Sequence, residues 1–335
     1  MEIRCGFSLR GAEQAQRNLS ADCDDDRTSF DGRRAATRSA WTDHLDRVRV
    51  DTGSDDRRTV FATALYHSLI KPCFAHGESP FWPSGGPFTF DICTMWDIYR
   101  TQLPLVTALF PDRAVELANA LLHVCEEEGN LPIGYRMARG ADRFARQASG
   151  LAHTFLADLC DLGVTGIDWE RALVNMHGDL LRSYGEEYLE RGITHPISQT
   201  LDVAFAYQCS AVVARRLGDR ALAGQFEALA TGWERAFDPA TGLLVDSSFY
   251  EGGKWNYSFR IVHDMARRIE LAGGEDAFLR LLDRFFGFGA DPVKQPGLHP
   301  AAEEMAAGLA LGRFEGLNNE PDMDAPWAEH DAGRP

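Results

Sequence analysis

The side chains best suited to bind and protonate a polar ring lie in residues 249–264, FYEGGKWNYSFRIVHD. Glu251 is a carboxylate followed by two glycines, which allow a tight turn and a close approach of the backbone to a ligand. A carboxylic acid beside aromatic groups has its neutral form favoured, as a general acid requires. The residues that follow suit a ring that is apolar on its faces and hydroxylated at its rim: Trp255, Tyr257, His263 and Asp264. A Gly-Gly turn before a helix that carries aromatic residues explains the same pattern without any chemistry.

A second candidate lies in TMWDIYRTQLPL, residues 94–105, where a helix is expected to begin after a loop. Asp97 and Arg100 are three residues apart, so they can pair on one face of that helix. Trp96, directly before Asp97, favours a pair that faces a sugar. An N-terminal helical aspartate with an ordinary surface ion pair is the alternative interpretation.

A third candidate is FEGLNNEPDMDAPW, residues 314–327, which is predicted not to be helical. Carboxylate and amide oxygens gather in it and suit a hard cation such as Ca²⁺. These donors are Asn318, Asn319, Glu320, Asp322 and Asp324. Their spacing does not match an EF-hand loop, and an acidic surface loop explains the composition equally well.

The composition is that of a globular protein that can bury a large core. The chain has 335 residues, of which 44% are hydrophobic, and its formal net charge is −16. This charge argues against a nucleic acid or an anionic membrane as partner, and it is compatible with a neutral ligand or a metal cation. It predicts nothing about the oligomeric state.

The seven cysteines are scattered and contain no CxxC pair, so they are expected to be free thiols, several of them in helical core positions. No apolar run approaches the ~20 residues of a membrane span. The first residues contain no signal-peptide segment, so the chain reads as cytoplasmic if Met1 is its true start.

From residue 33 onward the apolar spacing is helical. Long loops rich in glycine, proline and aromatic residues alternate with short connections, and they fall at 72–90, 129–146 and 238–255. The pattern predicts helical hairpins stacked around an axis, with functional residues on the loops at one end. The predicted helices span 33–48, 55–71, 95–109, 112–128, 147–162, 168–184, 197–217, 220–237, 257–272 and 275–287.

The first 32 residues are less regular, with a predicted strand at Ile3–Leu9 and a predicted short helix at Ala12–Leu19. Because a lone strand is not stable, this part is interpreted as the edge of a sheet whose partners are elsewhere. Further along, His153 is interpreted as a buried histidine satisfied by a neighbour. Ser198 is interpreted as a helix N-cap ahead of an in-helix acid, Asp202.

Taken together, eight segments resemble glycoside hydrolase family 92, the calcium-dependent exo-acting α-mannosidases. They occur in the order of the family and cover most of the chain. The segments are QAQRNL (14–19), VFATALYHSLIKP (60–72), MWDIYRTQLPL (95–105), NLPIGY (130–135), ISQTLDVAF (197–205), FYEGGKWNYSFRIVHD (249–264), AGGEDAFLRLLDRFF (272–286) and GLNNEPDMDAPW (316–327).

The resemblance implies a β-sandwich joined by a helix to an (α/α)6 toroid. The expected fold class is therefore mainly α, an incomplete (α/α)6 toroid of helical hairpins with a short remnant of an N-terminal β-sandwich. Residues 1–32 would be the sandwich remnant and linker, residues 33–53 a linker helix, and residues 54–335 the catalytic domain without its final helices.

The resemblance also implies an inverting, Ca²⁺-assisted hydrolysis of terminal α-linked mannose from glycans, as in N-glycan processing. Glu251 falls at the position of the general acid, and Asn319 and Glu320, with Asn318 before them, fall at the metal segment. Trp96 and Asp97 match sugar contacts. The other expected substrate-binding residues are Arg100, Trp255, Tyr257, His263 and Asp264.

Two departures limit what the resemblance implies. The family's T-L-E is Thr200-Leu201-Asp202 here, which leaves the linkage preference open. The general base of the family lies downstream of the match to residues 332–335, so this chain alone is expected to be weakly active or inactive. Family members are commonly secreted or periplasmic. Another (α/α)6 hydrolase, trehalase- or glucosidase-like, and a non-catalytic carbohydrate-binding protein are the remaining alternatives.

Overall fold

The computed structural model describes residues 3–23, 29–82, 86–92, 94–134, 150–245, 248–249, 252–286 and 320–334. These residues form a mainly helical protein with two short antiparallel strand pairs. β1 (Cys73–Phe74) pairs with β2 (Thr89–Phe90), and β3 (Ser248–Phe249) pairs with β4 (Gly252–Gly253). Within these residues no helix is both long enough and apolar enough to cross a membrane.

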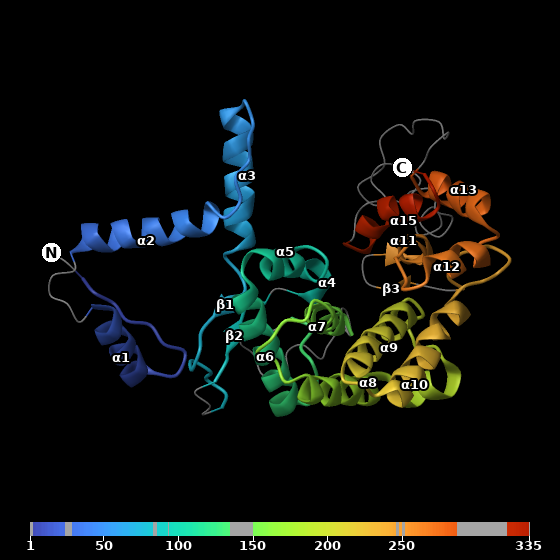
Figure 1. Ribbon diagram of the computed structural model, residues 1–335, viewed down its shortest axis with the longest axis horizontal. Coiled ribbons are helices and arrows are strands. Elements are labelled where there is room, and N and C mark those ends of the chain that lie inside the picture. The colour runs from blue at the N-terminus through green and yellow to red at the C-terminus, as the bar shows by residue number, and fades with distance from the viewer. Residues whose placement is uncertain are drawn as a thin grey trace.

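Helix α9 (Gln199–Arg216) is the centre of the helical body. Its sequence is almost entirely small or apolar through Ala214, and most of its residues are buried, as expected of a helix covered on all sides. It packs against α7 (Leu151–Asp161), α8 (Trp169–Arg191) and α10 (Arg220–Ala230) (Figure 1). A 3₁₀-helix, η2 (Thr231–Ala236), extends α10 and also packs against α9.

Local start and stop signals place several of these helices correctly. Asp168 caps α8 by accepting a hydrogen bond from the Arg171 N–H, and Gly218 follows α9 in the left-handed conformation at φ 85°. Gly129 ends α6 (Pro111–Glu128) in the same way, at φ 94°.

The helix predicted over 95–109 is interrupted. It consists of α4 (Met95–Ile98) and α5 (Gln102–Leu109), separated by residues 99–101. Pro104 explains the break, because proline lacks an N–H and its ring clashes with the carbonyl four residues earlier in a continuous helix. The side chains of Tyr99 and Arg100 therefore leave a helix end and do not follow a regular helix face.

The helix predicted over 257–272 is interrupted as well, so that prediction is wrong. α11 (Lys254–Ser258) ends early, and α12 (Met265–Leu271) begins after Asp264, which caps it by accepting from the Arg267 N–H. The residues between the two helices carry Arg260, whose side chain is buried inside the protein. In a continuous helix, the backbone carbonyls and amides of these residues would be used in hydrogen bonds within the helix.

Residues 314–327 were predicted not to be helical, and this is wrong for their described part. η4 (Glu320–Asp324) is a 3₁₀-helix that leads into α15 (Ala325–Asp331). Pro326 is tolerated because it lies in the first turn. The helix forms because Ala325 and Ala328 are buried in a second hydrophobic core. That core also contains Trp255 of α11, Phe259 directly after it, and Phe278, Leu282 and Phe285 of α13 (Glu275–Phe286).

Arg268 joins this second core to the main one. Its guanidinium carbon lies 3.9 Å from the ring centroid of Phe237 in the main core and 5.1 Å from that of Phe278 in the second. It donates hydrogen bonds to the carbonyls of Gly242 (2.7 Å) and Ser258 (3.1 Å). Burial lowers the pKa of Arg268 to about 9.

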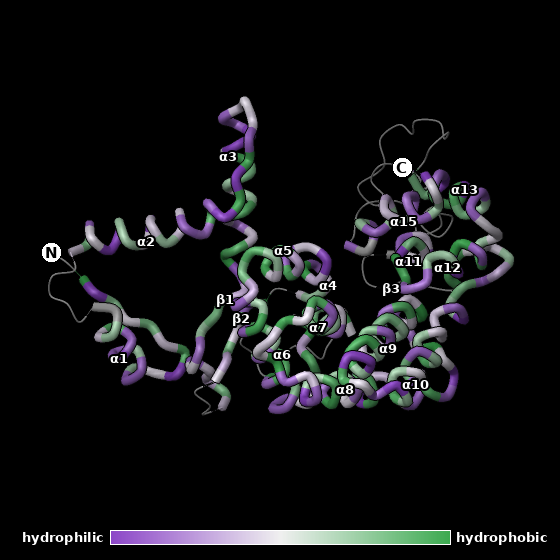
Figure 2. The backbone as a smooth tube through the Cα atoms, viewed as in Figure 1, coloured by the Kyte–Doolittle hydropathy of each residue, from purple (hydrophilic) through white to green (hydrophobic). Residues whose placement is uncertain are grey.

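The N-terminal part has three helices, α1 (Ala12–Cys23), α2 (Phe30–Leu45) and α3 (Asp55–Ser68). α1 lies away from the main helical body in Figure 1, whereas His44 near the end of α2 stacks on Phe110 of that body, with ring centroids 5.2 Å apart. The strand predicted at Ile3–Leu9 does not form, and Leu9 N–H instead donates to the carboxylate of Glu78. Figure 2 shows hydrophobic positions along α3, where Val60 is 69% exposed. The division into a sandwich remnant, linker helix and catalytic domain stays a prediction.

Two of the single-residue predictions have opposite outcomes. His153 is fully buried and its Nε2 lies 3.0 Å from the Met176 carbonyl, so the prediction of a satisfied core histidine is confirmed. Ser198 precedes α9, but its side chain makes no capping hydrogen bond, so the capping prediction is wrong. Ser198 is itself helical (φ −58°, ψ −30°), and the first N–H groups of α9 donate to preceding carbonyls, beginning with Pro196.

The cysteine prediction is confirmed for the thiols that the structure describes. Cys125, Cys160 and Cys209 are buried free thiols in helices, and Cys5 and Cys73 are free and more accessible. Burial raises the pKa of Cys125 and of Cys209 to about 12, so both stay protonated and behave as small core residues.

The packing of the helices can be tested by replacing each of two glycines with alanine. A Cβ on Gly232 would lie 2.6 Å from the Tyr188 hydroxyl and 2.7 Å from the Gly192 carbonyl oxygen, so Gly232→Ala is expected to lower the free energy of unfolding by about 1–3 kcal/mol. Gly224 on α10 has open space around it, so Gly224→Ala is expected to raise it by about 0.5–1 kcal/mol. Urea unfolding of both variants measures the difference, and changes of the same sign would contradict this packing.

Candidate active site

Two segments that are far apart in the sequence meet at the start of α4. The Met95 N–H donates to the Ile133 carbonyl at 2.6 Å, which brings the loop 130–134 against the MWD segment. The ring of Trp96 in turn lies 6.2 Å from that of Tyr257 on α11. The structure therefore brings together the segments that contain MWD, NLPIG and WNYSF.

A buried carboxylate on α8 binds the loop 130–134 by hydrogen bonds. Asp179 accepts hydrogen bonds from Asn130 Nδ2 (2.8 Å) and from the Leu131 N–H (3.0 Å). Its other oxygen is 3.7 Å from His153 Nε2. Burial raises the pKa of Asp179, and the neighbouring His153 and the two hydrogen bonds act in the opposite direction.

Arg260 is a buried charged group beside Trp96 and Tyr99. It is 4% exposed, and its Nη1 lies 2.6 Å from an oxygen of Asp202, which is 5% exposed. Its Nη2 donates to the Tyr99 hydroxyl at 3.0 Å, and its guanidinium carbon lies 5.1 Å from the ring of Trp96. Burial raises the pKa of Asp202 to about 6, against the opposing effect of Arg260. Arg260 thus fixes Trp96 and Tyr99 relative to α9.

Arg100 does not form the expected pair with Asp97. Helix α4 ends at Ile98, and Arg100 forms an ion pair with Asp324 of η4 instead. The backbone of Ile261 lies between these two charges. Arg100 donates to the Ile261 carbonyl at 3.3 Å, and Asp324 accepts from the Ile261 N–H at 3.2 Å.

The expected metal segment is described only from Glu320 onward, and Asn318 and Asn319 lie outside the described residues. Glu320 is half-buried at the start of η4. Asp322 is fully buried and accepts hydrogen bonds from Asn256 Nδ2 at 3.0 and 2.9 Å. The described part of the chain contains no group of three or more His, Cys, Asp or Glu side chains arranged to hold a metal.

The other expected site residues are dispersed. Glu251 lies outside the described residues, between β3 and β4 in the sequence. Trp255 is buried in the second core, beneath the guanidinium of Arg284 at 5.0 Å. His263 is half-buried, and burial lowers its pKa. Asp264 is exposed and caps α12.

The structure therefore brings Trp96, Tyr257 and Arg100 to one place and leaves Asp264 at a helix end. Sequence reasoning missed Arg260 and the partner of Arg100. A signal for Arg260 exists in the sequence, because both Arg260 and its partner Asp202 lie in apolar runs, YSFRIV and LDVAFAY. Charged residues in such runs are almost never fully buried unless they are paired.

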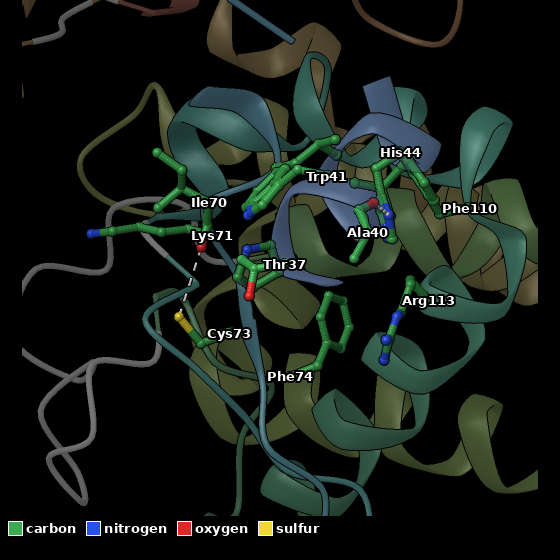
Figure 3. Close-up of a pocket in the computed structure, with 13 residues that line it drawn as sticks. Thr37, Ala40, Trp41, His44, Ile70, Lys71, Cys73, Phe74, Phe110 and Arg113 are labelled. Carbon is green, nitrogen blue, oxygen red and sulfur yellow. Dashed lines mark hydrogen bonds between the residues drawn. The ribbon is translucent and has the colours of Figure 1, made fainter. Parts of the chain in front are cut away.

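A separate cavity lies between α2 and the helical body and contains none of the expected site residues. It has a volume of about 450 Å³ and is lined by side chains of α2, of residues 69–74 and of α5 and α6. Figure 3 shows Trp41 and His44 of α2 on one side and Phe74, Phe110 and Arg113 around it. The Arg113 guanidinium carbon lies 5.1 Å from the ring centroid of Phe74, so these two residues lining the cavity make a cation–π contact.

Comparison with known proteins gives a consistent result. The sequence profile of the glycosyl hydrolase family 92 catalytic domain matches residues 14–335. An uncharacterized secreted glycosidase of Arthroderma benhamiae is 24% identical over 387 residues, covering 100% of this chain and 45% of that protein. The chain thus spans about half the length of this relative.

Solved structures show the fold. A family 92 α-mannosidase of Bacteroides thetaiotaomicron is 22% identical, with a TM-score of 0.77, and covers 98% of this chain and 46% of that chain. Its complex with mannoimidazole has a TM-score of 0.75, at 22% identity and with 97% and 46% coverage. A family 92 inverting mannosidase of the same organism is 21% identical, with a TM-score of 0.72 and coverage of 96% and 49%. The expected mainly α fold, that of the family's helical toroid, is confirmed.

The buried pair of Arg260 and Asp202 can be tested by substitution. Asp202→Asn leaves the Arg260 charge buried without its carboxylate, so the free energy of unfolding is expected to fall by about 3–5 kcal/mol. The double variant Asp202→Leu/Arg260→Met removes both charges and is expected to recover most of that loss. Urea unfolding measures both.

The control is the exposed pair Arg215–Glu227 on α9 and α10, with side chains 48% and 42% exposed. Glu227→Gln is expected to change the stability by less than about 1 kcal/mol. An Asp202→Asn variant as stable as Glu227→Gln would show that Arg260 does not depend on Asp202.

Proposed function

The chain belongs to glycosyl hydrolase family 92, and from that premise we propose that it carries out the exo-acting hydrolysis of terminal α-linked mannose from glycans. The observation that carries the proposal is the family match across residues 14–335. Two further observations support it. Solved relatives are α-mannosidases, one of them bound to mannoimidazole, and the MWD, NLPIG and WNYSF segments lie together in this structure.

We assign Glu251 the role of general acid in an inverting hydrolysis. In such a reaction an acid protonates the leaving oxygen while a carboxylate, ~6.5–9.5 Å away, activates water on the opposite face of the sugar. We assign no carboxylate to that second role.

The terminal sugar is proposed to contact the more accessible site residues. Asp97 and His263 are half-buried and can present polar atoms to hydroxyl groups. Trp96 and Tyr257 are 3% and 0% exposed, so their part is to form the wall that holds these groups in place. Trp255, Arg100 and Asp264 complete the set expected from the resemblance.

We also propose that Ca²⁺ binds the segment Asn318-Asn319-Glu320. Amide and carboxylate oxygens are the ligands that Ca²⁺ prefers, so the donors of this segment fit it. Asp322 and Asp324 of the described turn are engaged by Asn256 and Arg100, and Glu320 is half-buried at the start of that turn. Bound Ca²⁺ would hold and polarise the hydroxyl groups of the terminal mannose.

N-glycans are the proposed substrates, and a location outside the cytoplasm is proposed because the fungal relative is described as a secreted glycosidase.

The role of Glu251 is testable with azide, a nucleophile that needs no general base. Azide forms its bond to C1 opposite the leaving oxygen, the bond from C1 to that oxygen breaks, and Glu251 gives its proton to it. The chain with an aryl α-mannoside is expected to form β-mannosyl azide when azide is added. Glu251→Gln is expected to slow this by about 10²–10⁴-fold for a poor leaving group. The measurements are product release and the configuration at C1.

The matched control is Glu275→Gln, an exposed carboxylate in the first turn of α13, which should leave the rate unchanged. Sugar binding with no product under either condition would favour the non-catalytic carbohydrate-binding alternative. Turnover of an α-glucoside in preference to the mannoside would contradict the proposed substrate.

The metal assignment is testable without any activity. Titration of Ca²⁺ into the chelator-treated chain is expected to raise the midpoint of thermal unfolding, because a ligand that binds the folded state adds about 2.7 kcal/mol at 100 times its Kd. Glu320→Gln should reduce this shift, whereas Asp331→Asn, an exposed change on α15, should not. A calcium-independent midpoint would contradict the assignment.

A further inference from the structure

The cavity between α2 and the helical body is not used by the proposed function. Its volume of about 450 Å³ is within the ~300–1,000 Å³ of typical small-molecule sites. The lining comes from parts of the chain that are distant in the sequence, namely α2, residues 69–74, α5 and the start of α6. The cavity is therefore formed by the tertiary structure, and it is large enough for a small ligand.

Aromatic and aliphatic side chains form most of the lining. The aromatic ones are Trp41 of α2, Phe74 of β1 and Phe110, which directly precedes α6. Trp41 is supported by Tyr66 of α3, with ring centroids 4.6 Å apart. The aliphatic ones are Leu69, Ile70, Pro72 and Val106. Rings and branched chains of this kind favour a ligand with a flat, apolar body.

Three basic residues gather around Phe110 (Figure 3 labels two of them, His44 and Arg113). His44 stacks on the Phe110 ring with centroids 5.2 Å apart, and the Arg47 guanidinium carbon lies 4.5 Å from the centroid of the same ring. The backbone N–H of Arg113 donates to the Phe110 carbonyl at 2.9 Å. Within the described residues that line the cavity, no side chain is acidic.

Carboxylates neutralise only part of this positive charge. Arg113 uses Nη1 for an ion pair with Glu116, at 2.7 Å, and its side chain remains 51% exposed. Arg47 donates to the Leu109 carbonyl and has no ion-pair partner in the part of the chain that the structure describes. In a protein with a net charge of −16, a cluster of basic residues beside an apolar cavity favours an anionic ligand.

Lys71 does not extend this charge along the cavity. It lies on the opposite side from Phe110 in Figure 3, and its Nζ is paired with Asp91 at 2.8 Å. The cavity thus has one basic end, near Phe110, and an otherwise largely apolar lining. This arrangement fits a ligand with a single anionic group at one end of an apolar body.

We propose that the cavity binds a small aromatic carboxylate, with its ring among Trp41, Phe74 and Phe110 and its carboxylate near His44 and Arg113. Arginine presents several N–H groups in one plane, which match the two oxygens of a carboxylate. His44 Nδ1 lies 2.7 Å from a carbonyl oxygen of its own helix, so Nε2 is the nitrogen that can take up a second proton beside the anion. Such binding is independent of the proposed hydrolysis.

Isothermal titration calorimetry of the full chain with sodium 2-naphthoate tests the charge preference. The matched neutral compound is 2-naphthalenemethanol, which has the same rings without the charge. Naphthoate is expected to bind one molecule per chain and about 3–10-fold more tightly than the alcohol, because half-exposed charges add only modestly to affinity. Arg113→Gln is expected to raise the Kd for naphthoate about 2–5-fold and to leave that for the alcohol unchanged.

The matched control is Arg58→Gln on α3. The Arg58 side chain is 53% exposed, close to the 51% of Arg113, and it also pairs with a carboxylate three residues away, Asp55. Arg58 does not line the cavity, so its replacement should leave the Kd for naphthoate unchanged.

The location is tested by partly filling the cavity from α2. Ala40 lines it, so Ala40→Trp is expected to raise the Kd for naphthoate by about 10-fold, because the new ring takes space that the ligand needs. Ala35→Trp is the control, since this exposed residue lies five positions earlier and about 140° around the same helix. It should leave the Kd unchanged.

Four results would overturn the proposal. Naphthoate that binds no more tightly than the alcohol contradicts the charge preference, and the absence of heat with both compounds contradicts the site. Equal Kd values for the two tryptophan variants place the ligand elsewhere. A chain that is dimeric in sedimentation velocity, and monomeric only as Ala40→Trp, would show that a second copy of the chain occupies this cavity instead.

Discussion

The cost of burying charge governs how the described parts of this protein are joined. Arg260 and Asp202 are both about 5% exposed, and Asp324 is 4% exposed against Arg100. Because a buried charge is very unfavourable without a partner, each pair requires its two segments to meet in one arrangement. The pairs connect α9 to residues 260–261 and α4 to η4. Local helix geometry does not impose either connection.

These connections matter because the elements near the expected site are short. α4, α11 and η4 have only 4, 5 and 5 residues, too few to be stable as isolated helices. α4 packs against α7, and α11 and η4 pack against each other; Trp255 of α11 also belongs to the second core around Phe278 and Phe285. A rigid scaffold carrying short functional segments is the usual way in which binding residues are positioned.

Membership in family 92 concerns the fold of this chain, and the structure adds how individual residues near the expected site are held. The family match and the solved structures establish the fold, and the chain spans about half the length of those relatives. The structure adds that Trp96 and Tyr257 are enclosed and that Asp322 and Asp324 are bound by protein donors. In the proposed function, Asp97 and His263 contact the sugar and Glu320 the metal, beside the wall that the buried Trp96 and Tyr257 form.

The sequence by itself determined most long helices, their glycine ends, the buried free thiols and the family, because apolar spacing and capping residues act within a few positions. Tertiary structure alone decided the rest. Pro104 interrupts the predicted helix over 95–109, but the direction that Arg100 then takes depends on Asp324. Residues 320–331 are helical because Ala325 and Ala328 find a core, and Ser198 is not a cap because preceding carbonyls already accept the N–H groups of α9. Each outcome depends on a partner distant in the chain or on the exact backbone path, and local sequence periodicity records neither.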